Sequence, residues 1–303
     1  MAYYSLPDAG SATLLRDVEE TIQITVYSDE AGADADGSVT VGVVGADGST
    51  ILAAGTATTH PGGGSPHNDG VYQVAIPAQA NLNELTATWA GTWGSSSMTF
   101  TSLHGVVGGF YAVPAEVRGL DSISGETATF PAVDVVAAIN YAESVIDDYC
   151  GASFVPRFRR EVLSGTNSQT LKVSEMFPTK ILSASIDGTS LTAGEIADVA
   201  LLASGELVRK GATWTFTEPG LKVIVEYEHG ANVQAPDDIR WAARTLARYH
   251  LLEQVSRIPD RAISVQSEFG NIQLAQPGMN RPTPLPDVNV ILNRHRHRAP
   301  SLF

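Results

Sequence analysis

The sequence predicts an α+β protein. It begins with an N-terminal β-sandwich, followed by a domain of a few helices with a strand-rich insert and an extended C-terminal arm. Short apolar–polar alternations separated by Gly, Pro and Asn clusters fill the first hundred residues, and two long helical patterns follow with strands between them. A chain of 303 residues also exceeds a typical single domain. The glycine-rich residues 105–109 divide it into domains of 1–108 and 109–303, with the arm starting at about residue 258.

The first domain is predicted from alternating strands. They fall at residues 22–26, 39–43, 71–76, 85–89 and 98–100, and Asp47-Gly48 is a hairpin signal. A short helical piece is expected near Leu14-Leu15, and residues 60–70 form a turn-rich loop. The stretch 72–89 resembles an immunoglobulin-like domain of the kind often added to phage structural proteins. It lacks the cysteine pair of antibody domains.

Charge is distributed unevenly along the chain. Residues 1–110 contain one basic side chain, Arg16, against eleven acidic ones, whereas the remainder has 18 basic and 22 acidic residues. An acidic surface repels nucleic acid, so the first domain is a poor DNA binder, although solubility alone also explains such charge. Cys150 is the single cysteine, which rules out an intramolecular disulfide and fits assembly in a reducing cytoplasm. We find no apolar run of membrane-spanning length and no signal-peptide pattern.

The first long helix is expected after Pro131. Its apolar residues at 135, 138, 139, 142, 145, 146 and 149 form one stripe, and Asp134, Glu143, Asp147 and Asp148 fall largely on other faces. Gly151 is a suitable residue to end it. Cys150 has no evident basic partner, so a small buried thiol accounts for it better than a nucleophile.

Strands are predicted from residue 157 to 227, and the last one leads into the second long helix. Val223, Val225 and Tyr227 alternate with polar residues, which predicts a half-buried strand. His229-Gly230 ends this strand, and Pro236 opens a helix that reaches about Leu252. Arg240, Arg244 and Arg248 lie four residues apart on one face of that helix. They could face a neighbouring subunit or a DNA channel, or form a solvated face with weak local ion pairs.

The end of the chain is predicted to be loose. Residues 264–274 alternate like a strand, residues 276–286 hold four prolines, and a short helix begins at Pro286. It ends in the alternating Arg-His run of residues 294–298. That run could bind phosphate or metal, but a charged terminus is the commoner outcome.

Signatures of catalysis are missing from the sequence. It has no phosphate-binding GxxxxGK[ST] loop, no HExxH, no Gly-x-Ser-x-Gly and no CxxC pair, so no enzymatic activity and no cofactor are expected. His60, His67 and Asp69 flank the glycine-rich loop, but loop histidines are a better explanation than a metal site because no further ligand has a convincing spacing.

Residues 111–298 resemble the head-to-tail connector (adaptor) proteins of tailed bacteriophages. The likeness rests on the order of several motifs: Tyr-Ala-x-Pro-x-x-Val-Arg at 111–118, Gly-x-Ser-Phe-Val-Pro-Arg at 151–157, the Asp187-Gly188 turn, Trp214, and Tyr-x-His-Gly at 227–230 followed by an Ala/Leu/Arg helix. The family also often ends in a Val-x-x-Ile-Leu-x-Arg element, which is present at 288–294.

The resemblance implies a virion structural protein of the neck, made in the host cytoplasm. It implies a ring of twelve copies beneath the portal protein, with a channel through which double-stranded DNA passes without sequence-specific binding. Further partners would be the next neck or tail-completion protein and, through the first domain, the capsid vertex. The C-terminal residues Val288, Ile291, Leu292, Arg294, Arg296 and Arg298 would dock on the portal or a neighbouring subunit.

A binding module is the competing hypothesis. In it, the β-sandwich recognises host-surface glycans from a phage tail structure, and Trp89, Trp93 and Tyr72 stack on sugars. Core positions for these aromatic residues are the simpler expectation.

Overall fold

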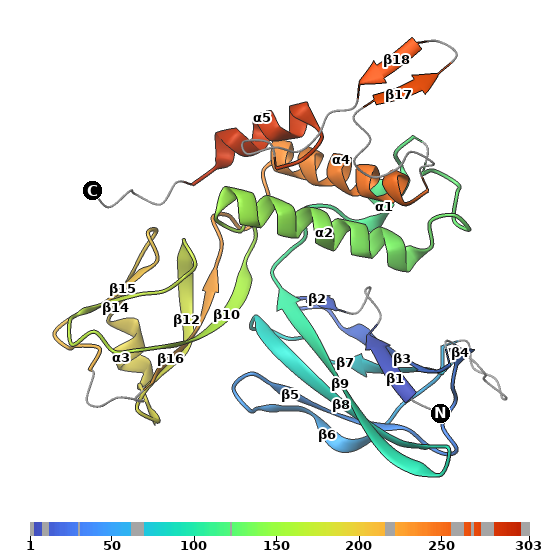
Figure 1. Cartoon of the computed structure of the whole chain (residues 1–303). Coiled ribbons are helices and arrows are strands. Elements are labelled where there is room, and N and C mark those ends of the chain that lie inside the picture. The colour runs from blue at the N-terminus through green and yellow to red at the C-terminus, as the bar shows by residue number, and fades with distance from the viewer. Residues whose placement is uncertain are drawn as a thin grey trace.

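The computed structural model describes residues 3–7, 12–29, 31–61, 70–121, 123–215, 222–255, 264–267, 270–273 and 282–297. They form three packed bodies: a β-sandwich, a layer of helices above it, and a second strand-rich body to one side (Figure 1). Each body has its own hydrophobic core. The α+β class predicted from the sequence is confirmed.

The β-sandwich consists of two sheets that enclose a core containing Trp89 and Trp93. One sheet contains β1 (Tyr3–Pro7), β3 (Glu20–Ser28), β4 (Ala31–Gly32) and β7 (Val71–Ile76). The other has the order β2 (Thr13–Leu15), β9 (Ser96–Val107), β8 (Asn83–Trp93), β5 (Thr40–Gly45) and β6 (Thr50–Ala57). Most pairs are antiparallel, whereas β2 runs parallel to β9.

The helical layer is built on the two long helices that the sequence predicts. Helix α2 (Ala132–Cys150) packs against α4 (Asp237–Gln254), and both contact α5 (Pro286–His295). The short α1 (Pro114–Arg118) packs against α2 and α4. Gly151 ends α2 in the left-handed conformation, at φ 72°. No helix among the described residues is both long and apolar enough to span a membrane.

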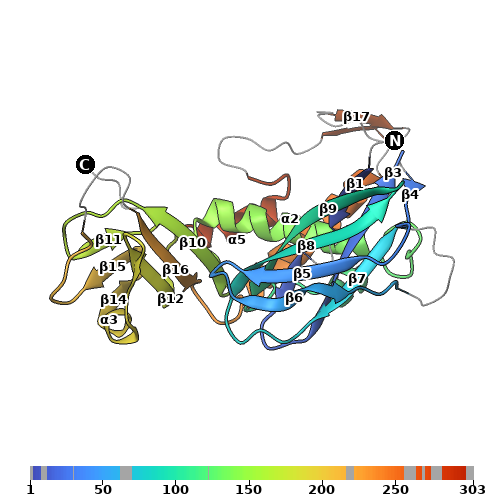
Figure 2. The same ribbon diagram turned by 90° about the horizontal axis from the view of Figure 1, so that it is seen from below.

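The strand-rich insert leaves the helical layer after α2 and returns to it before α4. One sheet has the order β10 (Arg157–Leu163), β16 (Val223–His229), β12 (Pro178–Ile186) and β13 (Thr189–Ser190). A second has the order β11 (Thr170–Lys172), β15 (Glu206–Arg209) and β14 (Val199–Leu202), beside α3 (Ala193–Ala197). Trp214 is fully buried in the core of the insert. Figure 2 shows the insert beside the sandwich.

A small hairpin of β17 (Ser264–Ser267) and β18 (Gly270–Gln273) lies between α4 and α5 in the sequence. In Figure 1 it stands clear of the helices. The alternation predicted over residues 264–274 therefore corresponds to two paired strands. Residues 62–69 of the predicted turn-rich loop at 60–70 and most of the proline-rich segment 276–286 lie outside the described residues.

Two local predictions were wrong. Leu14 and Leu15 lie in strand β2, not in a helix, because they pair with Val106 and Val107 of β9. Strand β16 was predicted to be half-buried, but Glu226, Glu228 and His229 are buried as well. The reason is its central place: β10 and β12 flank β16, and the sandwich lies next to the side that carries Glu228.

Candidate functional site

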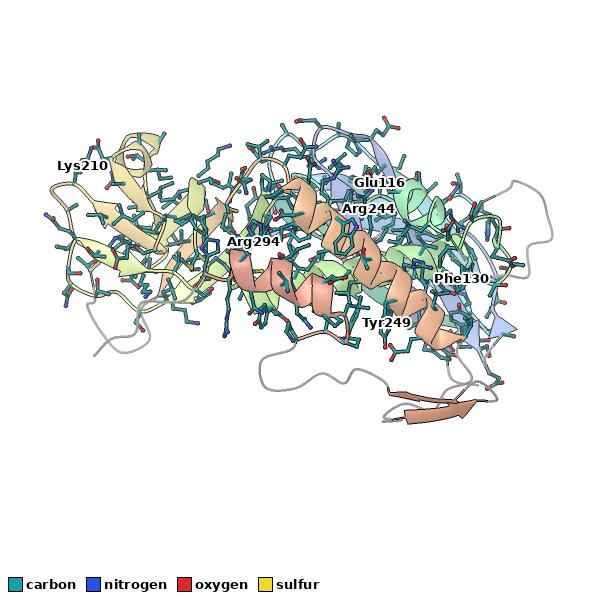
Figure 3. The ribbon with its side chains drawn as sticks, turned by 90° about the horizontal axis from the view of Figure 1, so that it is seen from above. Glu116, Phe130, Lys210, Arg244, Tyr249 and Arg294 are labelled. Atoms are coloured by element: carbon teal, nitrogen blue, oxygen red, sulfur yellow. The ribbon has the colours of Figure 1, made fainter. Side chains whose placement is uncertain are left out.

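The arginine stripe of α4 faces α1 and the loop that follows it. Arg240 forms an ion pair of 2.6 Å with Glu116 of α1. The Nε of Arg248 donates a hydrogen bond of 2.9 Å to the backbone oxygen of Asp121. Arg244, labelled in Figure 3, lies between them in the sequence of α4. Its Nε is buried, and none of the described residues accepts a hydrogen bond from it. The stripe thus binds the chain's own first helix; a contact with a neighbour or with DNA stays a prediction.

The C-terminal helix packs on the chain's own helical core. Val288 and Leu292 are fully buried there, and Ile291 is partly buried against the same cluster. Thr283 and Asn289 exchange hydrogen bonds at the start of the helix, including one of 2.7 Å from the Asn289 amide to the Thr283 carbonyl. The apolar residues predicted to dock on a partner therefore pack against the helical core of their own subunit.

The basic residues at the end of α5 contact two other helices. His295 lies 2.7 Å from Asp238, and Arg294 lies 3.9 Å from the same carboxylate at the start of α4. Arg296 stacks over the ring of Tyr149 at 4.9 Å, next to the C-terminus of α2, where the helix dipole favours a cation. Arg298 lies outside the described residues. The side chain of Arg294 stays 67% exposed, so much of its surface is accessible to a partner.

A buried polar network joins α2 to the chain on both sides of it. The backbone N–H of Tyr111 donates to Glu143 at 2.6 Å, and Arg157 of β10 forms an ion pair with the same carboxylate. The Tyr111 hydroxyl donates to Asp147 and accepts a hydrogen bond of 2.7 Å from the backbone N–H of Phe154. These contacts hold two chain segments against one face of α2: the segment at Tyr111, which leads into the helices, and residues 154–157, which lead into the insert.

Burial sets the protonation of this network. Burial raises the pKa of the Glu143 carboxyl, and the Arg157 guanidinium offsets part of that shift. Burial likewise raises the pKa of Asp147 to about 7, against the lowering effect of the hydrogen bond from Tyr111. Burial also raises the pKa of Tyr111, so its hydroxyl keeps its proton and acts as a donor. A pocket of about 290 Å³ borders the network, between α2 and the strands β2 and β9.

The sandwich is joined to the insert by charged side chains. Arg16, the only basic residue in the first 110, forms an ion pair of 3.4 Å with the buried Glu228 of β16. Lys180 of β12 donates a hydrogen bond of 3.1 Å to Asn81 of the sandwich. Phe158 of β10 packs against the sandwich core. Arg16 was not predicted to contact another part of the chain, although its isolation in an acidic domain was a usable signal.

Glu143 was predicted to lie off the apolar stripe of α2, but it is buried. A signal was available, because position 143 is four residues after Ile139 and three before Ile146, which places it at the border of the stripe. Its partner Arg157 comes from the neighbouring strand and could not be identified from spacing alone. The prediction of a buried thiol is confirmed: Cys150 is fully buried, and burial raises its pKa to about 12.

The described residues offer no catalytic or metal-binding arrangement. Ser102 and His104 lie 2.8 Å apart, but both are buried in the sandwich, where Trp89 donates to Ser102. No cluster of three or more potential metal ligands occurs in the part of the chain that the structure describes. His67 and Asp69 lie outside that part.

The three aromatic residues of the glycan-binding hypothesis belong to the sandwich core. Trp89 and Trp93 are fully buried, and Tyr72 is 2% exposed. The Trp93 indole donates to the backbone oxygen of Ala33, and the Tyr72 hydroxyl accepts from the backbone N–H of Ala35. None of these rings can stack on a sugar, so the hypothesis loses the residues on which it depended.

Comparisons with known proteins bear on the second domain. Residues 121–265 match the family model described as head completion protein. This segment contains α2, the whole insert and α4. The search of curated proteins found no match.

Among solved structures, the chain is similar to one in the neck of an empty GTA particle computed with C6 symmetry. The identity is 16% and the TM-score 0.41, over 60% of this chain and 88% of that one. A chain in the virion of a native gene transfer agent (GTA) particle gives 15% identity and a TM-score of 0.42, over 60% and 88%. The Lin-41 filamin domain gives 12% identity and a TM-score of 0.24, over 34% and 90%.

Proposed function

We propose that the chain is a structural protein of a phage particle and the head-to-tail adaptor of the neck, because residues 121–265 match the family model described as head completion protein. The family match carries this proposal. It spans both long helices and the insert between them, the region in which the sequence motifs resemble phage connector proteins.

In this proposal twelve copies form a ring directly beneath the portal protein. A closed cyclic array satisfies a head-to-tail interface on every subunit. The ring would bind the portal on one side and the next neck or tail-completion protein on the other. Double-stranded DNA would pass through its channel without sequence-specific contacts, and the net charge of −14 would limit adhesion of the DNA backbone.

We further propose that residues 1–108 and 109–303 are the two functional units. Residues 109–303 would form the adaptor domain with the C-terminal arm, and residues 1–108 would be an immunoglobulin-like module at the periphery, close to the capsid vertex. The separate core and strongly acidic composition of the first unit support this division. Density for the sandwich lining the channel would overturn its peripheral placement.

Arg244 is the member of the stripe that we propose contacts a neighbouring subunit. Arg240 and Arg248 bind α1 and the loop after it, whereas the half-buried Arg244 forms no ion pair with any described residue, which leaves its charge available to an acidic group of a neighbour. At the end of the chain, the exposed Arg294 is the corresponding candidate for docking on the portal or a neighbour.

The test is complementation of a phage that lacks this gene, followed by cryo-EM of the neck with symmetry tested rather than imposed. The wild-type chain should restore tailed, infectious particles and produce a ring directly under the portal. Arg244→Met should lower the yield of tailed particles, whereas Lys172→Met, which removes an exposed charge from the insert, should leave it unchanged. Density for the chain only at the tail tip, or none in the particle, would refute the adaptor function.

A further inference from the structure

The outer face of α2 carries exposed apolar residues together with acidic ones. Val133, Ala137 and Tyr141 lie on the side of the helix that points away from its buried residues, and all three are exposed, Tyr141 by 47%. The exposed Asp148 continues this side toward the end of the helix, and Asp134 borders it near the start. We call these five residues the acidic face. Helix α2 contains no basic residue, so no positive charge of its own offsets this face.

The outer face of α4 carries an exposed tryptophan beside an arginine. Trp241 is 40% exposed and lies on the side of α4 opposite the buried Ile239 and Leu246. Thr245 follows it one turn later, and Arg244 borders the same side. We call Trp241, Arg244 and Thr245 the tryptophan face. Arg244 is half-buried and forms no ion pair with any described residue, so its charge is available to a partner.

The charges of the two helices are complementary. Between Asp238 and Glu253, α4 contains three arginines and no acidic residue. Asp237, at the start of the same helix, lies 3.8 Å from Arg240. The tryptophan face is therefore set in a positive stretch of helix, whereas the charged residues of α2 are all acidic. Two copies of the same face repel each other, and the two unlike faces attract.

The two faces point to opposite sides of the helical layer. Helices α2 and α4 pack against each other through their buried residues, which belong to one core. Each outer face lies on the far side of its own helix from this core. Figure 1 shows the two helices together in one layer. One copy can therefore use α2 toward one neighbour and α4 toward the other, which is the arrangement that a head-to-tail ring requires.

We propose that the tryptophan face of one copy packs against the acidic face of the next copy. The inference rests on the proposed ring and names the acidic surface that Arg244 meets there. Trp241 and Tyr141 supply the aromatic area that is enriched at the centre of protein interfaces. Asp134 and Asp148 of the neighbouring copy supply the countercharge. Double-stranded DNA accounts for the arginine but not for the exposed tryptophan, because duplex binding rests chiefly on phosphate contacts.

The size of the faces makes this a weak contact between isolated chains. The acidic face extends over about 22 Å of helix at 1.5 Å per residue, and a helix with its side chains is about 10 Å wide. Each copy then contributes roughly 220 Å², so the two sides together bury about 440 Å², which is below the range of stable interfaces. The contact therefore forms when other parts of the ring have gathered the copies, since a tether raises the effective concentration to the millimolar range.

Cysteine cross-linking in assembled particles tests the contact. The wild-type chain is the blank, because its only cysteine, Cys150, is buried. The variant with Ala137→Cys and Thr245→Cys has one thiol on each face. A matched control combines Thr245→Cys with Ala197→Cys, which moves the first thiol to another exposed alanine, at the end of α3 in the insert. Particles complemented with each variant are treated with a short bismaleimide and analysed by denaturing electrophoresis.

The expected result is a ladder of multimers, at least ten-fold stronger for the pair on the two faces than for the control pair. Each single-cysteine variant should stay monomeric. Dimers from either single variant would show like faces in contact and overturn the proposal. So would equal ladders from both pairs, or no ladder from particles that contain the chain, which is the outcome expected if α4 faces DNA. If an immunoblot finds no chain in purified particles, the proposed neck function fails and this inference falls with it.

A charge reversal tests the electrostatic part of the contact. Adding Asp148→Arg to the variant with both reporter cysteines should weaken the ladder at least three-fold, because a positive charge then approaches the positive stretch of α4. Adding Asp198→Arg, at an exposed aspartate that ends α3, should leave the ladder unchanged. The ladder is normalised to the amount of chain in the particles. Equal ladders from the two reversals would overturn the charge pairing that the proposal requires.

Discussion

Replacing Arg157 with alanine should destabilise the second domain more strongly at pH 8 than at pH 5. The change leaves Glu143 buried without its counter-charge, and breaking a buried ion pair in this way costs about 3–5 kcal/mol. Glu143 keeps its hydrogen bond from the Tyr111 backbone, and the Arg157 side chain is 17% exposed, so we expect the low end, about 3 kcal/mol. With about 2–4 °C per kcal/mol for a domain of this size, Tm should fall by roughly 6–12 °C at pH 8.

The pH dependence follows from the direction of the pKa shift. Burial raises the pKa of Glu143 in the folded state, and Arg157 counteracts part of that rise. Without Arg157 the folded-state pKa rises further above the unfolded one, so stability is retained at low pH and lost as pH rises through the folded pKa. Thermal unfolding followed by circular dichroism measures the fall in Tm at pH 8 and at pH 5. The double variant with Glu143→Gln should recover about half of the loss at pH 8. Equal losses at the two pH values, or no recovery, would refute the reasoning.

Three further variants test other parts of the structure. Burial raises the pKa of Asp147 to about 7, so the wild-type chain should become less stable as pH rises from about 4 to 7, because the folded acid holds a proton that the unfolded acid releases. Asp147→Asn should flatten the dependence of Tm on pH in this range. An unchanged slope would contradict this prediction. Gly230→Ala should lower the free energy of unfolding by about 3 kcal/mol or more in denaturant titrations, because φ is 145° and a Cβ would lie 2.5 Å from a backbone oxygen. Gly188→Ala, at φ 77° with open space around it, should lower it by about 1 kcal/mol. Equal losses in the two variants would count against the close approach at Gly230. Leu292→Ala should lower the free energy of unfolding by about 2–5 kcal/mol and speed amide hydrogen exchange in α5. Val290→Ala, at a residue that is 58% exposed, should change both quantities little. Equal hydrogen-exchange protection of α5 in the two variants would mean that its buried face does not hold the helix in place.

Local pattern was a reliable guide to the elements. The stripe of α2 was readable because its apolar residues repeat with the helical period, and the burial of Val135, Ile139 and Ile146 follows from that stripe. The turn at Gly230 was readable for a similar reason, since glycine accepts the backbone angle that the strand end requires. In each case the physical cause lies within a few residues of its effect.

Predictions that depended on a distant partner were the ones that failed. Leu14 forms a strand because β9, some ninety residues later, offers it a parallel edge. Glu228 is buried because β16 lies between β10 and β12 and the sandwich packs beside it, which brings Arg16 to Glu228 across 212 positions of sequence. Neither partner leaves a mark on the local sequence pattern, so periodicity alone assigned a helical piece to the first and a solvated face to the second.

The sequence by itself determined the class of the protein, its division into an acidic first part and a mixed second part, and the order of motifs that resembles phage connector proteins. Each of these properties depends on residues that are close together in the sequence, so it can be predicted one stretch at a time. Only the tertiary structure decided that Arg240 binds Glu116, that the apolar α5 residues fill the chain's own core, and that Arg157 pairs with the buried Glu143. Such contacts depend on which elements pack together when the whole chain folds. Burial, pairing and exposure of a side chain are set by that packing and not by the residues next to it in the sequence.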